Sequence, residues 1–240
     1  MKALSNNIVD VVIAAAGQSR RMGDFPVNKP FLLLNGQPLL ARCLTFFESI
    51  ASVGKIAVVT AEADISAAQS LVRECGCAKV AGVIAGGQER QASVFKGLQF
   101  LAAGQRAPAP LVAVHDAARP FLSAALFQEL LDTAQEYSAA IPALPVKDTI
   151  KLLGTANTVQ ETLPRARLVA VQTPQVFAFS LLLRAHQQAE AHGYQGTDDA
   201  ALFELWGAPV TVVKTDYDNL KITTPHDLLV AQALEQQKNA

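Results

Sequence analysis

The sequence is poor in the features that mark several protein classes. Its 240 residues include only three cysteines and one tryptophan, and 20 basic side chains against 21 acidic ones give a formal net charge of -1. This near-balance argues against a broad electrostatic surface for DNA or RNA. No apolar run is long enough to cross a bilayer, and residues 1–10 lack the apolar core of a secretory signal. We therefore expect a cytoplasmic protein that binds neither nucleic acid nor membrane.

The cysteines do not form a metal-binding pattern. Cys75 and Cys77 form a Cys-Gly-Cys pair, Cys43 stands alone, and no second pair of cysteines or histidines follows at the spacing of a zinc site. The sequence therefore favours small, partly buried thiols in a reducing compartment.

The two commonest phosphate-binding loops are also missing. Neither G-x-G-x-x-G nor G-x-x-x-x-G-K-[ST] occurs in the chain. Absence of the first makes a nicotinamide-dependent oxidoreductase improbable, although the strand pattern alone would allow one. A nucleotide site in this protein must therefore be of a different kind.

The hydrophobic pattern predicts one α/β domain over residues 1–240. Half of the residues are hydrophobic, and runs rich in valine and isoleucine alternate with segments of helical period. Such alternation is typical of a mostly parallel central sheet covered by helices on both faces, as in Rossmann-like folds. The expected strands are 10–14, 55–60, 80–85, 111–115 and 209–214. The expected helices are 38–50, 63–74, 89–101, 123–137, 180–192, 198–206 and one after Pro225.

Residues from about 139 to 171 interrupt this pattern. Short β-like pieces at 140–146, 149–153 and 158–163 are broken by prolines and a glycine. An isolated pair of strands is marginally stable in water, so we expect a protruding β-arm that packs against a second subunit. The arm thus predicts a homodimer.

The first expected strand leads into a segment suited to phosphate. Ala15, Ala16 and Gly17 follow it directly, and Arg21 and Lys29 come soon after. Small residues let main-chain N–H groups approach an anion, and the cations neutralise charge on an attacked phosphoryl group. The segment predicts an enzyme that acts on a nucleotide.

Three further polar clusters follow expected strands. Gly86 and Gly87 precede a helix, so they can approach a base or ribose closely. Asp116 ends a strand and is the best candidate for Mg²⁺, which favours carboxylate and phosphate oxygens. Asp218 and Lys221 lie close together after the last expected strand and could close the same site.

Together these segments resemble the 2-C-methyl-D-erythritol 4-phosphate cytidylyltransferase family. The resemblance rests on ordered motifs at residues 15–22, 86–94, 115–120, 145–151, 173–175, 197–199 and 219–223. It implies a Rossmann-like nucleotidyltransferase fold with a dimerisation arm. The implied reaction joins CTP and 2-C-methyl-D-erythritol 4-phosphate, giving CDP-methylerythritol and pyrophosphate.

The resemblance also implies roles for individual residues. The catalytic cations would be Arg21, Lys29 and Lys221. The CTP site would use Ala15, Ala16, Gly17, Gly87, Gln88, Ser93 and Asp116. The acceptor would be held by Arg119, Thr149, Arg165 and Thr173. The Mg²⁺ ligands would be Asp116 and Asp218.

Two alternatives remain open. A ribitol-5-phosphate cytidylyltransferase would share the architecture, but 15–17 and 116–119 favour methylerythritol phosphate. A nucleotide-binding module without catalysis is the other, and the joint presence of Lys29, Arg21 and Asp116 argues against it. Release of pyrophosphate from CTP with each acceptor would separate the three.

Overall fold

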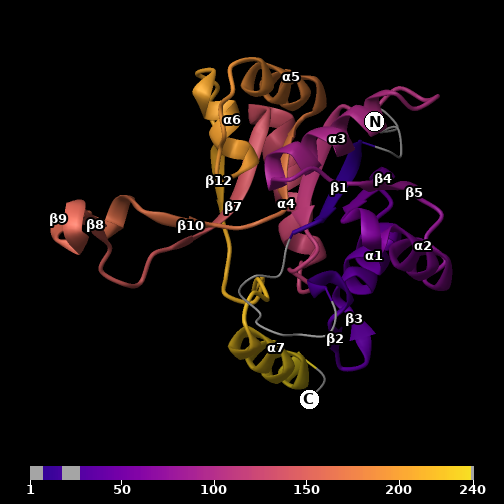
Figure 1. Ribbon diagram of the computed structural model, residues 1–240, viewed down its shortest axis with the longest axis horizontal. Helices are drawn as coiled ribbons and strands as arrows, with labels where there is room; N and C mark the ends of the chain where they lie inside the picture. Colours follow the sequence, from indigo (N-terminus) through magenta and orange to yellow (C-terminus); the bar gives the residue numbers. More distant parts are fainter. Residues whose placement is uncertain (1–7, 18–27, 239–240) are drawn as a thin grey trace.

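The chain folds around one eight-stranded sheet (Figure 1). The computed structural model describes residues 8–17 and 28–238. The strand order is β10-β7-β11-β6-β1-β4-β5, and β12 pairs with β7 beside this path. The strands are β1 (Val9–Ala15), β4 (Val53–Thr60), β5 (Val80–Ala85), β6 (Leu111–Asp116), β7 (Ala139–Pro145), β10 (Val169–Val171), β11 (Gln175–Ala178) and β12 (Thr211–Lys214).

The middle of the sheet is parallel. β1 pairs in parallel with both β4 and β6, and β4 pairs in parallel with β5. β11 is antiparallel to β6 and β7, so the complete sheet is mixed. Because parallel strands end at the same edge, the carboxyl ends of β1, β5 and β6 meet where ligands of open α/β sheets bind.

Helices cover both faces of the sheet, as the sequence predicted. Valine, isoleucine and leucine of the strands form one buried cluster with α1, α2 and α4, and a second with α3, α5 and α6. The helices are α1 (Leu39–Ser49), α2 (Ile65–Glu74), α3 (Arg90–Ala102), α4 (Ala124–Tyr137), α5 (Phe179–Ala191), α6 (Asp199–Leu205) and α7 (Pro225–Lys238). Within residues 8–17 and 28–238, no helix is both long and apolar enough to cross a membrane.

A small third cluster joins two distant segments. Leu32 and Leu34 pack with Ile222 and Ala231 below the sheet. Leu32 follows a short 3₁₀ helix (Lys29–Phe31), Leu34 belongs to the hairpin of β2 (Leu33–Leu34) and β3 (Gln37–Pro38), and Ala231 lies on α7. The cluster therefore fastens the segment that carries Lys29 to the one that carries Lys221.

The protruding arm is narrower than residues 139–171. The expected first arm strand, 140–146, is β7, an interior strand that pairs with β10, β11 and β12. The hairpin of β8 (Lys151–Leu153) and β9 (Val159–Thr162) stands clear of the sheet together with the segments that connect it to β7 and β10 (Figure 1), and every residue of both strands is exposed.

Candidate active site

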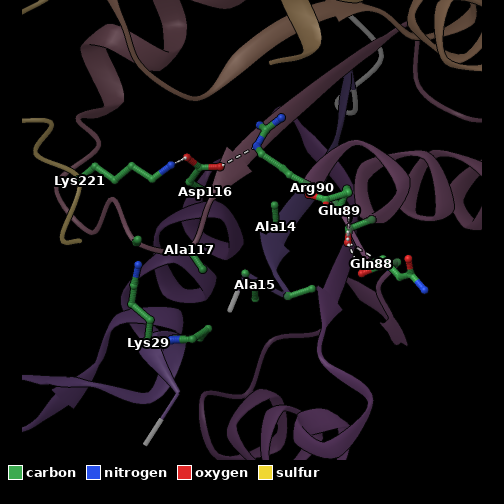
Figure 2. Close-up of a pocket in the computed structure, with 15 residues that line it drawn as sticks. Ala14, Ala15, Lys29, Gln88, Glu89, Arg90, Asp116, Ala117 and Lys221 are labelled. Carbon is green, nitrogen blue, oxygen red and sulfur yellow. Dashed lines mark hydrogen bonds and ion pairs between the residues drawn. The ribbon is translucent and has the colours of Figure 1, made fainter. Parts of the chain in front are cut away.

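A cavity of about 380 Å³ opens at the carboxyl edge of the parallel strands. Its walls come from the segment after β1, the 3₁₀ helix at Lys29, the turn before α3, the end of β6, and Lys221. Nine sequence-predicted residues line it: Ala15, Ala16, Gly17, Lys29, Gly87, Gln88, Ser93, Asp116 and Lys221. In Figure 2 the two lysines lie on one side of the cavity and Gln88 on the other. Arg21 lies outside the described residues.

Asp116 is the electrostatic centre of this cavity. Its Oδ2 is 2.5 Å from Nζ of Lys221, and its Oδ1 is 3.2 Å from Nε of Arg90. Burial alone would raise the pKa of Asp116, but the charges of Arg90 and Lys221 outweigh burial and hold the pKa well below its usual range. The carboxylate is therefore ionised throughout the neutral range.

Arg90 is a site residue that was not singled out from the sequence. It is the first residue of α3, and it lines the cavity. The positive end of a helix dipole disfavours a cation, so an arginine at this position needs acidic partners. That position in the sequence was the signal that could have identified it.

The glycines before α3 are required by close packing. A Cβ on Gly86 would lie 2.6 Å from Cβ of Ala16, and one on Gly87 would lie 2.5 Å from Cβ of Ala92. Ser93 Oγ accepts a hydrogen bond from the Gly87 N–H at 3.0 Å and donates one to the Glu89 carbonyl at 3.0 Å. Ser93 therefore shapes the turn that forms one wall of the cavity.

Arg119 and Thr173 lie behind Asp116 and do not line the cavity. Both are buried, at 8% and 5% exposure. Thr173 Oγ1 accepts a hydrogen bond from the Asp116 N–H at 3.0 Å, and Arg119 donates to the Asn219 carbonyl at 2.7 Å. They fix the end of β6 and the segment that leads to Lys221.

His115 is a structural histidine in this arrangement. Its Nε2 donates to the Arg119 carbonyl at 3.0 Å, and burial lowers its pKa to about 4. The ring is therefore neutral near pH 7.

The remaining predicted residues lie away from the cavity wall. Thr149 and Arg165 are exposed and belong to the arm, where Arg165 Nη1 donates to the Lys147 carbonyl at 3.0 Å. Asp218 is half-buried, and its N–H donates to Oδ1 of Asp216 at 2.9 Å. The part of the chain that the structure describes contains no cluster of three His, Cys, Asp or Glu residues able to hold a metal ion.

Known proteins resemble this chain over nearly its whole length. The sequence model of the 2-C-methyl-D-erythritol 4-phosphate cytidylyltransferase family matches residues 9–237. Proteins of that name from Geobacillus kaustophilus and Geotalea uraniireducens are 44% identical over 225 residues and 42% identical over 233 residues. The first match covers 94% of this chain and 96% of the relative, and the second 97% and 98%.

Solved structures agree with the sequence comparison. The crystal structure of the cytidylyltransferase from Thermus thermophilus is 35% identical with a TM-score of 0.74, covering 94% of this chain and 98% of that one. The 4-diphosphocytidyl-2C-methyl-D-erythritol synthase from Anaerococcus prevotii is 28% identical with a TM-score of 0.82, covering 96% and 97%. This chain belongs to the 2-C-methyl-D-erythritol 4-phosphate cytidylyltransferase family.

Proposed function

We propose that the protein transfers CMP from CTP to 2-C-methyl-D-erythritol 4-phosphate, releasing pyrophosphate, in the non-mevalonate isoprenoid pathway. Family membership supports this reaction. The observation that carries it is the cavity at the sheet edge, where Lys29 and Lys221 lie opposite the turn that carries Gln88 and Asp116 lies beside Lys221 (Figure 2).

The reaction is a single in-line displacement. An oxygen of the acceptor phosphate attacks the α-phosphorus of CTP, a new P–O–P bond forms, and the bond to the β-phosphate oxygen breaks. Both substrates are anions, so the main obstacles are their mutual repulsion and the charge of the transition state. Lys29 and Lys221 supply positive charge from one side of the cavity, and we assign the same role to Arg21.

The turn at Gly86 and Gly87, before α3, forms the side of the cavity that we assign to the nucleoside. Gly87 and Gln88 line it, and the absence of a side chain at Gly87 lets the turn pack against Ala92 of α3, which places its backbone where a base or ribose would bind. Ala15, Ala16 and Gly17 form the floor, where small residues leave room for the phosphates. Ser93 keeps the turn in this shape.

A Mg²⁺ ion held largely by substrate would suit this cavity. Mg²⁺ commonly binds through one or two carboxylates, with phosphate oxygens and water completing its shell. Asp116 is ionised and lines the cavity, so we assign it as the protein ligand; Asp218 is the weaker candidate because it is not part of the wall. When bound, the ion would neutralise phosphate charge.

The acceptor side of the site involves the arm. Thr149 and Arg165 lie on the exposed arm and are not among the residues that line their own chain's cavity. We propose that they bind the acceptor phosphate in the cavity of a partner subunit, which makes the working enzyme a homodimer. Arg119 and Thr173 support the wall nearest to Asp116.

Pyrophosphate release tests the proposed reaction. The purified protein is incubated with CTP and Mg²⁺, together with methylerythritol phosphate, ribitol 5-phosphate or no acceptor. We expect release with methylerythritol phosphate alone. Faster release with ribitol 5-phosphate would reassign the acceptor. No release with either acceptor would indicate a nucleotide-binding module without catalysis.

A further inference from the structure

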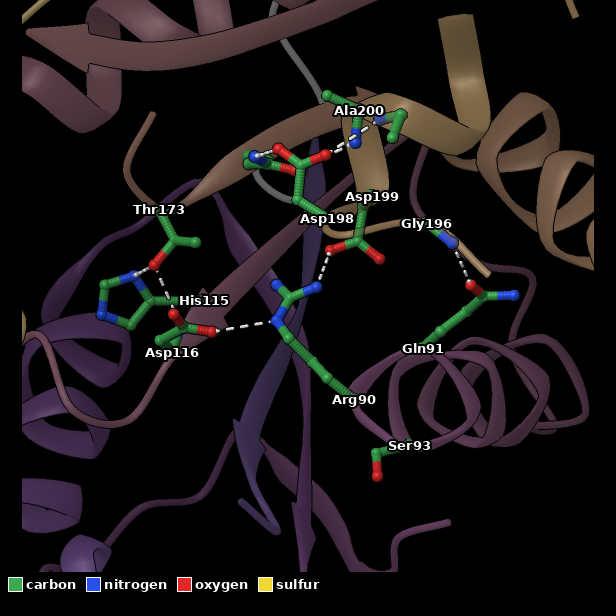
Figure 3. Close-up of polar contacts among 12 residues, drawn as sticks. Arg90, Gln91, Ser93, His115, Asp116, Thr173, Gly196, Asp198, Asp199 and Ala200 are labelled. Carbon is green, nitrogen blue, oxygen red and sulfur yellow. Dashed lines mark hydrogen bonds and ion pairs between the residues drawn. The ribbon is translucent and has the colours of Figure 1, made fainter. Parts of the chain in front are cut away.

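A line of polar side chains runs from the cavity into the neighbouring helices, and Figure 3 shows its first three members, Asp116, Arg90 and Asp199. Arg90 lies between two carboxylates, with Nε 3.2 Å from Oδ1 of Asp116 and Nη1 2.7 Å from Oδ2 of Asp199. Beyond Asp199, Nε2 of His186 lies 3.1 Å from its Oδ1. The line therefore connects β6, α3, α6 and α5, and Asp199 and His186 are not part of the cavity wall.

Asp199 is a buried charge with both oxygens occupied. Its side chain is completely buried, and each of its oxygens contacts one partner, Arg90 or His186. Burial alone would raise the pKa of Asp199, but the charge of Arg90 and the hydrogen bond to His186 lower it. An ionised carboxylate costs free energy in a buried site unless it is paired. The ionised Asp199 carboxylate is therefore tolerated in the core because it pairs with Arg90.

Arg90, whose side chain is 30% exposed, is held by few contacts. Its Nη2 is buried and has no hydrogen-bond partner in the described part of the chain. Without Asp199, the guanidinium would keep the Nε contact to Asp116, a carboxylate that Lys221 already shares. The orientation of Arg90, and with it that of Asp116, therefore depends on Asp199.

We propose that Asp199 is a positioning residue for the nucleotide cavity: it holds Arg90 against Asp116, while His186 holds Asp199 in place. This inference rests on the proposed function for its kinetic readout. It assigns a role in that reaction to two residues that have no contact with the cavity.

A double-mutant cycle tests whether Asp199 acts through Arg90. We measure kcat/KM for CTP in the wild type, Asp199→Asn, Arg90→Gln and the double variant. Asp199→Asn is expected to lower kcat/KM by about 10- to 100-fold, because a displacement near 1 Å at a reacting site costs about 100-fold. In the Arg90→Gln background the same substitution is expected to change kcat/KM by less than about 3-fold. An equal factor in both backgrounds would overturn the proposal.

Asp198 provides a matched control. This neighbouring carboxylate accepts from the Ala201 N–H at 2.9 Å and from Gln175 Nε2 at 2.7 Å, so it caps α6 and does not contact Arg90. Asp198→Asn is expected to lower the melting temperature while kcat/KM per folded molecule stays unchanged. If Asp198→Asn and Asp199→Asn lower kcat/KM equally, the role of Asp199 is structural only and the proposal fails.

Substitutions at His186 provide a second test in case Asp199→Asn does not fold. His186→Leu removes the donor to Asp199 and is expected to lower kcat/KM several-fold, whereas His186→Gln restores an N–H donor and most of the rate. Equal rates in the two variants contradict the proposal.

The affinity for CTP separates this inference from the proposed reaction. Calorimetry without acceptor measures the dissociation constant of CTP in the same set of variants, whether or not the wild type releases pyrophosphate. Absence of turnover refutes the reaction, while loss of the coupling between Asp199 and Arg90 in CTP affinity refutes the positioning role.

Discussion

Among individual residues, Lys29 contributes most directly to the proposed chemistry. It lines the cavity from the 3₁₀ helix before β2, opposite the turn that holds Gln88 (Figure 2). A cation that acts on the transition state lowers the barrier without tightening the ground state to the same degree.

We therefore predict that Lys29→Ala lowers kcat by about 100- to 1,000-fold with a much smaller rise in KM for CTP. Steady-state release of pyrophosphate measures both constants. Lys79→Ala is the control, because Lys79 donates to the Ile50 carbonyl far from the cavity wall. Near-normal turnover of Lys29→Ala would remove Lys29 from the mechanism.

The sequence predicts site residues well where a local pattern decides their position. Gly17, Gly87 and Asp116 all follow strands, and the strands of a parallel sheet end at one edge, so their meeting was predictable. The contact between Arg90 and Asp199 spans 109 residues. No local sequence pattern predicts which buried carboxylate pairs with Arg90, since the pairing depends on how α3 and α6 pack.

At the scale of elements, α7 begins with a reciprocal cap. Asp227 Oδ2 accepts from the Thr223 and Thr224 N–H groups, each at 2.8 Å, while the Asp227 N–H donates to Thr224 Oγ1 at 3.2 Å. Pro225 occupies the first turn, where a missing N–H costs nothing. Burial raises the pKa of Asp227, but the hydrogen bonds from Thr223 and Thr224 together outweigh burial and lower it overall.

A pH dependence follows from this cap. A carboxyl whose pKa is lowered by folding adds stability above its unfolded pKa of about 3.9, and this stability is lost as the pH falls through the folded value. We predict that Asp227→Asn lowers the free energy of unfolding by about 1 kcal/mol at pH 7. The difference from the wild type should shrink below about pH 4. Urea titrations at several pH values measure it, with Asp132→Asn on α4 as the control; a pH-independent difference would contradict the assignment.

The small apolar cluster around Ile222 leads to a separate prediction about the position of Lys221. Ile222 is completely buried beside Leu32 and Leu34, so truncation leaves a cavity between the segments that carry Lys29 and Lys221. Ile222→Ala should destabilise the fold by roughly 2 to 5 kcal/mol and also lower kcat per folded molecule. Leu130→Ala, a comparable truncation on α4, should lower stability alone. Equal kcat in the two folded variants would mean that the cluster does not position the lysines.

The elements that sequence patterns misjudge are those that depend on distant partners. Short β-like pieces broken by prolines, Pro142 and Pro145 among them, predicted an arm at 139–171. The structure nevertheless places Pro142 within β7, opposite Val213 of β12. β11 has only four residues, and its position between β6 and β7 is fixed by tertiary pairing. The long strands and helices were predicted because each buries a regular apolar pattern of its own.

For the whole molecule, the arm raises the question of a shared site. β8 and β9 project from the sheet and expose Leu152, Leu153 and Val159, at 43%, 56% and 58% (Figure 1). Exposed apolar side chains on an isolated hairpin favour burial against another chain. Because Arg165 lies on this arm and Lys29 on the cavity wall, each active site of the proposed dimer would take residues from both subunits.

Mixing two inactive variants tests this arrangement. In a heterodimer of Lys29→Ala and Arg165→Ala chains, one site carries both defects and the other carries neither. Random exchange of subunits makes half of the dimers hybrid, so about a quarter of wild-type turnover should return. Lys29→Ala mixed with Lys221→Ala should recover nothing, because both defects then lie on cavity walls and every site keeps one. Failure of the first mixture to regain activity, once mass spectrometry has shown that hybrids formed, would place Arg165 at its own chain's site or outside the reaction altogether.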